Sequence, residues 1–132
     1  MKKGIDSAVG IVQIEVTPEM TAHLEDLVKH DVYATYWLAY HAELAGMRAI
    51  QPFFEEGENA VGTAIQLSHR AMAGVGAHVV VRASVASING DKIRFSITAV
   101  ATNTKTLLAE GHVDQMVLST EVLEKKVASA TR

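Results

Sequence analysis

Cysteine is absent from the chain. Without a thiol the protein has no disulfide, no thiolate nucleophile and no cysteine-ligated zinc site. Long apolar runs are absent as well, so no segment reaches the length of a membrane span. The Met1-Lys2-Lys3 start is not followed by the apolar core of a signal peptide. We therefore expect a cytoplasmic protein that has no membrane partner.

An excess of positive charge is also lacking. Lys and Arg total 12 against 15 Asp and Glu, which gives a formal net charge of -3. Such a balance offers no electrostatic reason to bind nucleic acid. The 132 residues, of which 48% are hydrophobic, are enough to form one core. We expect residues 1–132 to form a single domain in which residues 119–132 are a frayed, solvated tail.

Alternation of apolar and polar residues predicts five strands. Asn89-Gly90 lies between two of these alternating runs and is a strong hairpin signal. Residues 19–30 are predicted as a short helix or a flap, and residues 53–59 as a loop. The predicted strands are residues 10–16, 60–70, 77–88, 92–101 and 106–118.

One long apolar helix is predicted between the first two strands. It begins near Thr35 and ends around Gln51-Pro52, because proline prevents a smooth continuation. The fold class that follows is α+β, with a five-stranded antiparallel sheet wrapped around this helix. A helix that is apolar nearly all round is normally buried, which favours a homodimer in which a second copy covers what one sheet leaves open.

Glu43 is the single acid in this apolar helix. Burial of an unpaired carboxylate costs several kcal/mol, so Glu43 needs partners or a function. His69 is in phase with the apolar residues of its strand, and both Glu43 and His69 are predicted to point toward the core. Thr35 stands at the start of the helix, two turns before Glu43. The three side chains could converge where the helix meets the sheet, with substrate or water between Glu43 and the other two.

Each of these residues also has a structural interpretation. Thr35 is well placed to be a helix N-cap, which the sequence alone favours. His69 could be a satisfied core histidine, and Glu43 could be solvated in a dimer cleft. The remaining histidines show no metal-ligand spacing with any acid, so no metal site is predicted.

Several short motifs resemble those of a known family. They are V-Y-A-T at residues 32–35, Glu43 eight residues after the Thr, V-G-T at residues 61–63 and S-H at residues 68–69. Together they resemble the hotdog-fold acyl-CoA thioesterases, specifically the fluoroacetyl-CoA thioesterase-like branch. The resemblance covers residues 32–118.

The resemblance implies a hotdog fold that works as a homodimer, with the site at the subunit interface and a tetramer as a further possibility. It implies a catalytic set of Thr35, Glu43 and His69, in which Glu43 is either the nucleophile or the general base. No metal or redox cofactor is implied, and coenzyme A enters as part of the substrate. The residues implied to contact the substrate are Tyr36, Trp37, Gly62 and Thr63.

The sequence departs from the family pattern in two places. The last strand reads G-H-V-D-Q at residues 111–115, whereas the family often has a G-x-H-x-R-like stretch. His112 has therefore moved to the other face of the strand and Gln115 replaces an Arg, so one contact to coenzyme or substrate is expected to be missing. Residues 21–30 also lack the phenylalanines that form a lid in the fluoroacetate-specialised enzymes.

We therefore expect an acyl-CoA thioesterase that hydrolyses a short- or medium-chain substrate rather than fluoroacetyl-CoA. One alternative is a non-catalytic hotdog module that binds acyl-CoA or a related ligand. Another is a hotdog hydratase or dehydratase, which would also use an acid and an imidazole on a thioester. Release of free thiol distinguishes the hydrolase from both alternatives.

Overall fold

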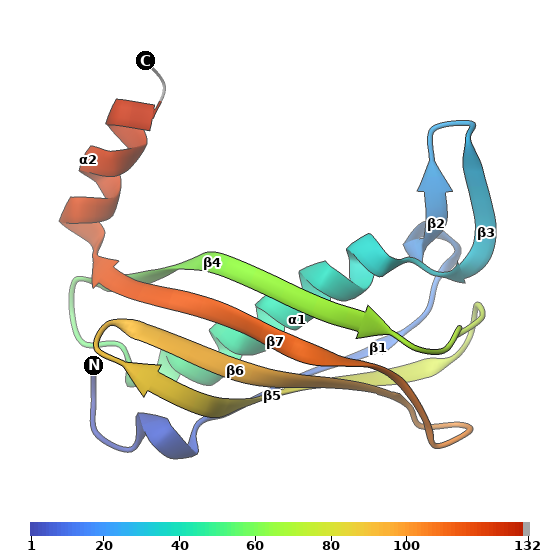
Figure 1. Ribbon diagram of the computed structural model, residues 1–132, viewed down its shortest axis with the longest axis horizontal. Coiled ribbons are helices and arrows are strands. Elements are labelled where there is room, and N and C mark those ends of the chain that lie inside the picture. Colours follow the sequence, from blue (N-terminus) through green and yellow to red (C-terminus); the bar gives the residue numbers. More distant parts are fainter. Residues whose placement is uncertain (131–132) are drawn as a thin grey trace.

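The computed structural model describes residues 1–130. Five strands form one antiparallel sheet in the order β1-β5-β6-β7-β4, and this sheet curls around helix α1 (Figure 1). Each strand differs from its predicted range by at most two residues at either end. The elements of this layer are β1 (Val9–Glu15), α1 (Thr35–Ile50), β4 (Glu58–His69), β5 (His78–Asn89), β6 (Lys92–Ala101) and β7 (Thr106–Ser119).

The core lies between the concave face of the sheet and α1. Strand β6 alternates exposed and buried residues along its length, as the period of two requires. Helix α1 lies directly on β1 at Gly10, where a Cβ atom would collide with the backbone of Ala45 and Ala49. The buried residues of α1 are Leu38, His41, Ala42, Ala45, Gly46, Ala49 and Ile50.

The expected turn between β5 and β6 is present. Asn89 pairs with Lys92, so the turn contains two residues. Gly90 adopts a φ of 61°, a left-handed conformation that favours glycine. The Asn-Gly signal thus identified both the hairpin and the residue that makes the turn possible.

Residues 19–30 form a hairpin rather than the short helix that was one of their two predicted structures. A single 3-10 turn, η2 (Pro18–Met20), precedes β2 (Thr21–Leu24) and β3 (Val28–Tyr33), which form a separate two-stranded sheet. At its end, β3 also forms an isolated bridge from Val32 to Gly74. The β2–β3 hairpin projects beyond the sheet at one end of β4 (Figure 1).

Helix α1 is not buried on all sides in the single chain. It ends at Ile50 and runs into the 3-10 turn η3 (Gln51–Phe53), which contains the proline. One of its sides exposes Tyr36, Tyr40 and Glu43. The sheet of one chain therefore covers only one side of α1, and the expectation that a second copy covers the rest remains a prediction.

The predicted frayed tail is a helix, α2 (Thr120–Ala130). The hydroxyl of Ser119 accepts a hydrogen bond from the N–H of Val122 at 3.1 Å, as an N-cap does. Glu121 and Lys125 form an ion pair one turn apart. None of the residues of α2 is buried, so this segment is helical and exposed where the sequence predicted a frayed, solvated tail.

The two edges of the sheet differ. At β1, the Arg48 guanidinium from α1 donates a hydrogen bond to the carbonyl of Ile11 at 2.9 Å. At the other edge, β4 pairs only with β7 among the described residues, and Gly62 to Gln66 are all exposed. One edge is therefore partly covered by α1, whereas the other is open along the middle of its strand.

Neither helix within residues 1–130 has the length and hydropathy that a membrane-spanning segment needs. The cytoplasmic location and the assignment of residues 1–132 to a single domain remain predictions. The end of the predicted tail, residues 131–132, lies outside the described residues.

Candidate active site

Thr35 and His69 meet where α1 begins and β4 ends. The Thr35 hydroxyl lies 2.9 Å from Nδ1 of His69, and the tautomer of the imidazole decides which atom donates. Ala34, not Thr35, is the N-cap residue of α1, and no side chain caps this helix. The N-cap interpretation of Thr35 is therefore wrong, and its hydroxyl is instead a partner of the imidazole.

The imidazole of His69 is half-buried. Its Nε2 atom is closed to solvent and has no hydrogen-bond partner within residues 1–130. Burial lowers the pKa of His69, and the nearby backbone of Ala71 offsets part of this effect. His69 is therefore neutral at pH 7 and able to accept a proton.

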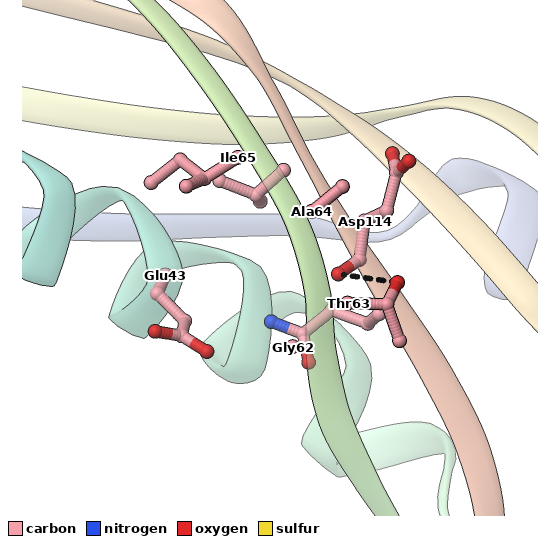
Figure 2. A pocket seen from close by; sticks show the side chains of 8 residues that line it. Glu43, Gly62, Thr63, Ala64, Ile65 and Asp114 are labelled. Atoms are coloured by element: carbon pink, nitrogen blue, oxygen red, sulfur yellow. Dashed lines mark hydrogen bonds between the residues drawn. The ribbon is translucent and has the colours of Figure 1, made fainter.

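Glu43 lies on the exposed side of α1 and faces β4 at Gly62. Figure 2 shows its carboxylate directed toward the Gly62 backbone. A Cβ atom at position 62 would collide with Oε1 of Glu43, so only glycine leaves room for the carboxylate. The prediction of an inward, core-facing Glu43 is wrong for the single chain, because the side chain is exposed and lies in a surface cavity.

Two cavities meet at Glu43. The first has a volume of about 230 Å³ and follows β4 around the irregularity at Thr63, which has no partner in the β4–β7 register. The second, of about 370 Å³, runs along α1 and is lined by Tyr40, Leu44 and Met47. Both are also lined by Glu43, Gly62 and Gln115. Glu43 therefore stands where two largely apolar cavities meet.

Asp114 is the other acid on the first cavity, but its carboxylate is already paired. Arg94 binds it through two hydrogen bonds of 2.8 and 3.0 Å and lowers the pKa of Asp114. The carboxylate points away from Glu43 (Figure 2), and its backbone carbonyl accepts a hydrogen bond from Thr63. Glu43 is thus the acid that this cavity leaves free for chemistry.

Of the three residues in the implied catalytic set, the structure brings together Thr35 and His69 but not Glu43. Glu43 follows Thr35 by eight positions in α1, which places the two residues about 12 Å apart along the helix axis. Among the described residues no hydrogen bond or ion pair joins Glu43 to either partner. A single chain therefore holds the set in two parts.

The residues implied to contact the substrate fall into two groups. Gly62 and Thr63 line the first cavity beside Glu43. The Tyr36 hydroxyl instead binds the backbone of β2 through three contacts of 3.0 to 3.2 Å, which attach the β2–β3 hairpin to α1. The Trp37 ring packs on Tyr40 and His41. Neither of these two aromatic side chains lines the cavities at Glu43.

Gln115 is a site residue that the sequence analysis treated only as a lost contact. Its side chain is completely buried, although it belongs to the lining of both cavities. The signal was present in the period of β7, because Gln115 is in phase with the buried residues Val113 and Val117. A polar residue at an inward position of a strand marks a candidate site.

Comparison with known proteins agrees with this geometry. A family described as fluoroacetyl-CoA-specific thioesterase matches residues 16–121. The fluoroacetyl-CoA thioesterase of Streptantibioticus cattleyicolor is 35% identical over 69 residues, which are 52% of this chain and 50% of that protein. The chain therefore matches about half the length of this curated relative.

Solved structures extend the likeness to nearly the whole chain. A Thermus thermophilus hypothetical protein of the thioesterase superfamily has a TM-score of 0.91 and 33% identity, over 96% of this chain and 92% of that one. A fluoroacetyl-CoA thioesterase structure has a TM-score of 0.82 and 26% identity, over 93% of this chain and 94% of that one.

A curled five-stranded sheet around a helix that presents a carboxylate to a cavity is thus the hotdog-like fold of thioesterases. The chain belongs to the fluoroacetyl-CoA-specific thioesterase family, a family of thioester hydrolases.

Proposed function

We propose that the protein hydrolyses short- or medium-chain acyl-CoA thioesters to the carboxylic acid and free coenzyme A. The observation that carries this proposal is the exposed Glu43 carboxylate, which lies against Gly62 at the junction of two cavities. With the thioester carbonyl at this junction, Glu43 acts in one of two ways. Either its carboxylate attacks the carbonyl carbon and displaces the thiolate, after which water hydrolyses the acyl anhydride, or it activates a water molecule that attacks the same carbon and displaces the thiolate.

The Thr35–His69 pair supplies the proton transfers in this scheme. Neutral His69 accepts a proton and returns it to the departing thiolate, while Thr35 orients the ring through the 2.9 Å contact. The first N–H groups of α1, at Tyr36 and Trp37, have no acceptor within the helix and can polarise a carbonyl. The scheme needs only these groups, and coenzyme A takes part as a portion of the substrate.

The acyl chain is assigned to the apolar groove along α1. Tyr40, Leu44 and Met47 line it, and its volume of about 370 Å³ suits an acyl chain of modest length. The absence of phenylalanine from the β2–β3 hairpin favours such a chain over a fluoroacetyl group.

The complete site is assigned to a homodimer formed through the open edge of β4. A two-fold axis makes the two β4 strands of a dimer antiparallel. This axis would pass near Ala64, which is the middle residue of the exposed segment Gly62 to Gln66. Along the strands, His69 of the partner subunit would then be about three residues, or roughly 10 Å, from Gly62. Within one chain the separation is seven residues, or roughly 23 Å. Glu43 of one subunit would thus work with the Thr35–His69 pair of the other.

Thiol release from a panel of acyl-CoAs of increasing chain length tests the activity. Wild type should turn over at least one chain length, and Glu43→Ala should lose activity by a factor of about 10³ or more. Glu56→Ala, which removes an exposed acid from the loop before β4, is the matched control and should retain full activity. Binding of acyl-CoA by wild type without any thiol release would instead identify a non-catalytic binding module.

A mixture of two inactive variants tests the shared site. Glu43→Ala and His69→Ala subunits are unfolded together in equal amounts and refolded. Half of the dimers are then mixed, and each mixed dimer has one intact site and one doubly altered site, so about one quarter of wild-type activity should return. Variants refolded separately and combined afterwards provide the control. No recovery in a mixture that is shown to contain mixed dimers would place the whole set within one chain.

A further inference from the structure

Gln115 carries an unusual polar group inside the core. Its exposed fraction is 0%, and neither Nε2 nor Oε1 has a hydrogen-bond partner among residues 1–130. Leaving a buried donor or acceptor unpaired is unfavourable, because the group has lost its hydrogen bonds to water. Buried polar groups are paired in the great majority of cases, so each exception calls for an explanation.

Two glycines lie next to Gln115. Gly62 is the residue opposite Gln115 in the β4–β7 ladder. Gly46 of α1 lies above it, and a Cβ atom there would be 3.5 Å from Nε2 of Gln115. The amide therefore lies under α1, one turn beyond Glu43 and on the inner side of the same β4 residue that the Glu43 carboxylate contacts.

Gln115 also borders the groove along α1 in which we propose that the acyl chain lies. Gln115 is part of the wall of both cavities that meet at Glu43. The other residues along the groove are Tyr40, Leu44, Met47, Ala60 and Val61, so Gln115 supplies an amide among largely apolar neighbours. A group close to the thioester carbonyl would lie beside Gln115, and a rotation of this side chain would bring its amide, which is closed to solvent in the protein alone, into contact with that group.

The chemistry of the amide selects what it can hold. It offers an N–H donor and a carbonyl acceptor, which together match a hydroxyl group, and the donor alone matches an oxo group. A second carboxylate on the acyl chain is disfavoured, because the Glu43 carboxylate would repel it.

We propose that Gln115 is a specificity-determining residue that selects uncharged acyl thioesters with a hydroxyl or oxo group close to the thioester carbonyl. This proposal rests on the thioesterase function above and narrows its substrate class. Binding of such an acyl group pairs an amide that the protein alone leaves unpaired, whereas a plain acyl chain of the same length does not.

The test compares butyryl-CoA with 3-hydroxybutyryl-CoA, which have the same number of carbon atoms. Calorimetric titration is done on Glu43→Ala protein, so that turnover does not consume the ligand, and again on the Glu43→Ala, Gln115→Met double variant. Kinetic constants are measured in parallel on wild type, Gln115→Met and Met47→Leu. The last variant is the matched control, because it changes the groove without changing its hydrogen bonding.

We expect at least about tenfold tighter binding of the hydroxyacyl ligand, and loss of that preference when Gln115 becomes Met. Gln115→Met should also unfold at an equal or higher temperature, because an apolar side chain of similar shape removes the unpaired amide. Met47→Leu should change both ligands alike. Equal binding of the two ligands to the Glu43→Ala protein, or a Gln115→Met effect that is the same for both, would overturn the proposal.

The readouts also separate this proposal from the proposed reaction. A binding preference that disappears with Gln115→Met, in a protein that releases no thiol, supports the role of Gln115 and refutes the hydrolysis. Thiol release with no preference in binding supports the hydrolysis and refutes the role of Gln115.

Discussion

Gly62 leaves the space that the Glu43 carboxylate occupies. Gly62→Ala should displace this carboxylate, because the added Cβ would collide with Oε1. We expect kcat/KM to fall by about 10²-fold or more, since a misplacement of about 1 Å can have an effect of this size. Steady-state thiol release measures the effect.

Gly74→Ala is the matched control for this substitution. A Cβ at position 74 meets nothing within 4 Å, and the residue does not adopt a positive φ. This variant should keep both activity and melting temperature. Full activity in Gly62→Ala would show that the close approach of Glu43 to β4 has no part in turnover.

A buried hydrogen bond makes stability depend on pH. The Tyr33 hydroxyl lies 2.5 Å from Nδ1 of His41, and both side chains are buried. Burial, and secondarily Arg48, lowers the pKa of His41 below its ordinary value of 6.5, while burial raises that of Tyr33. Neutral His41 therefore accepts a hydrogen bond from the hydroxyl of neutral Tyr33.

The direction of the pH effect follows from this pair. Because the folded state disfavours protonated His41, its contribution to stability is complete above about pH 6.5 and is lost as the pH falls through the lowered pKa. Melting temperature should decrease between pH 7 and pH 5. His41→Gln, which can still accept a hydrogen bond but does not titrate, should make this decrease smaller. An unchanged slope in His41→Gln would assign the acid sensitivity to other groups, His69 first among them.

At the level of single residues, the sequence showed which residues are candidates for the site better than it showed how buried they are. Glu43, His69 and Thr35 were found because an acid in an apolar helix, or a histidine in phase with apolar residues, breaks a pattern. The prediction that Glu43 points toward the core was wrong for the single chain. Periodicity shows which residues share a side of α1, but it does not show whether the sheet covers that side. Gln115 is a polar residue at an apolar position of β7 and breaks the pattern in the same way. It was interpreted only as the loss of an Arg that would contact the coenzyme or the substrate.

The open edge of β4 is the element on which assembly is proposed to depend. Ile65 is 49% exposed on this strand, and Ile65→Lys places a charge in the proposed seam. We expect the dimer to dissociate and turnover to fall with it, as measured by light scattering and thiol release on the same sample. Val9→Lys is the matched control on the other edge strand, where Val9 is 43% exposed, and it should remain dimeric. A dimeric, active Ile65→Lys protein would move the interface away from β4.

The elements themselves were largely predictable, and each failure has a local cause. The five strands alternate clearly, so their first and last residues were predicted to within two residues. The hairpin of β2 and β3 was missed because these short strands project from the sheet and expose both faces, which removes the alternation. Helix α2 was missed because residues 119–132 were interpreted as a solvated chain end, although Ser119 and the Glu121–Lys125 pair mark a helix whose residues are not buried.

Across the whole molecule, stability is concentrated in the sheet and α1. A chain that ends at Ser119 lacks α2, which contains no buried residue. We expect its melting temperature to stay within about 4 °C of wild type, since substitutions and losses at exposed positions seldom exceed about 0.5 kcal/mol. Thermal unfolding followed by circular dichroism measures this, with activity as a second readout. A much larger decrease would mean that α2 packs against a second copy.

The contrast between the two edges of the sheet limits how far the protein can assemble. A sheet with two open edges can add chains without end, and this is the geometry of a fibre. Here Arg48 holds a carbonyl of β1 and α1 crowds that strand at Gly10. Pairing through β4 would use up the open edge of each chain and leave a guarded edge at both outer ends. Growth would stop at two chains, so the same contact that holds α1 on the sheet would also protect the protein from polymerisation.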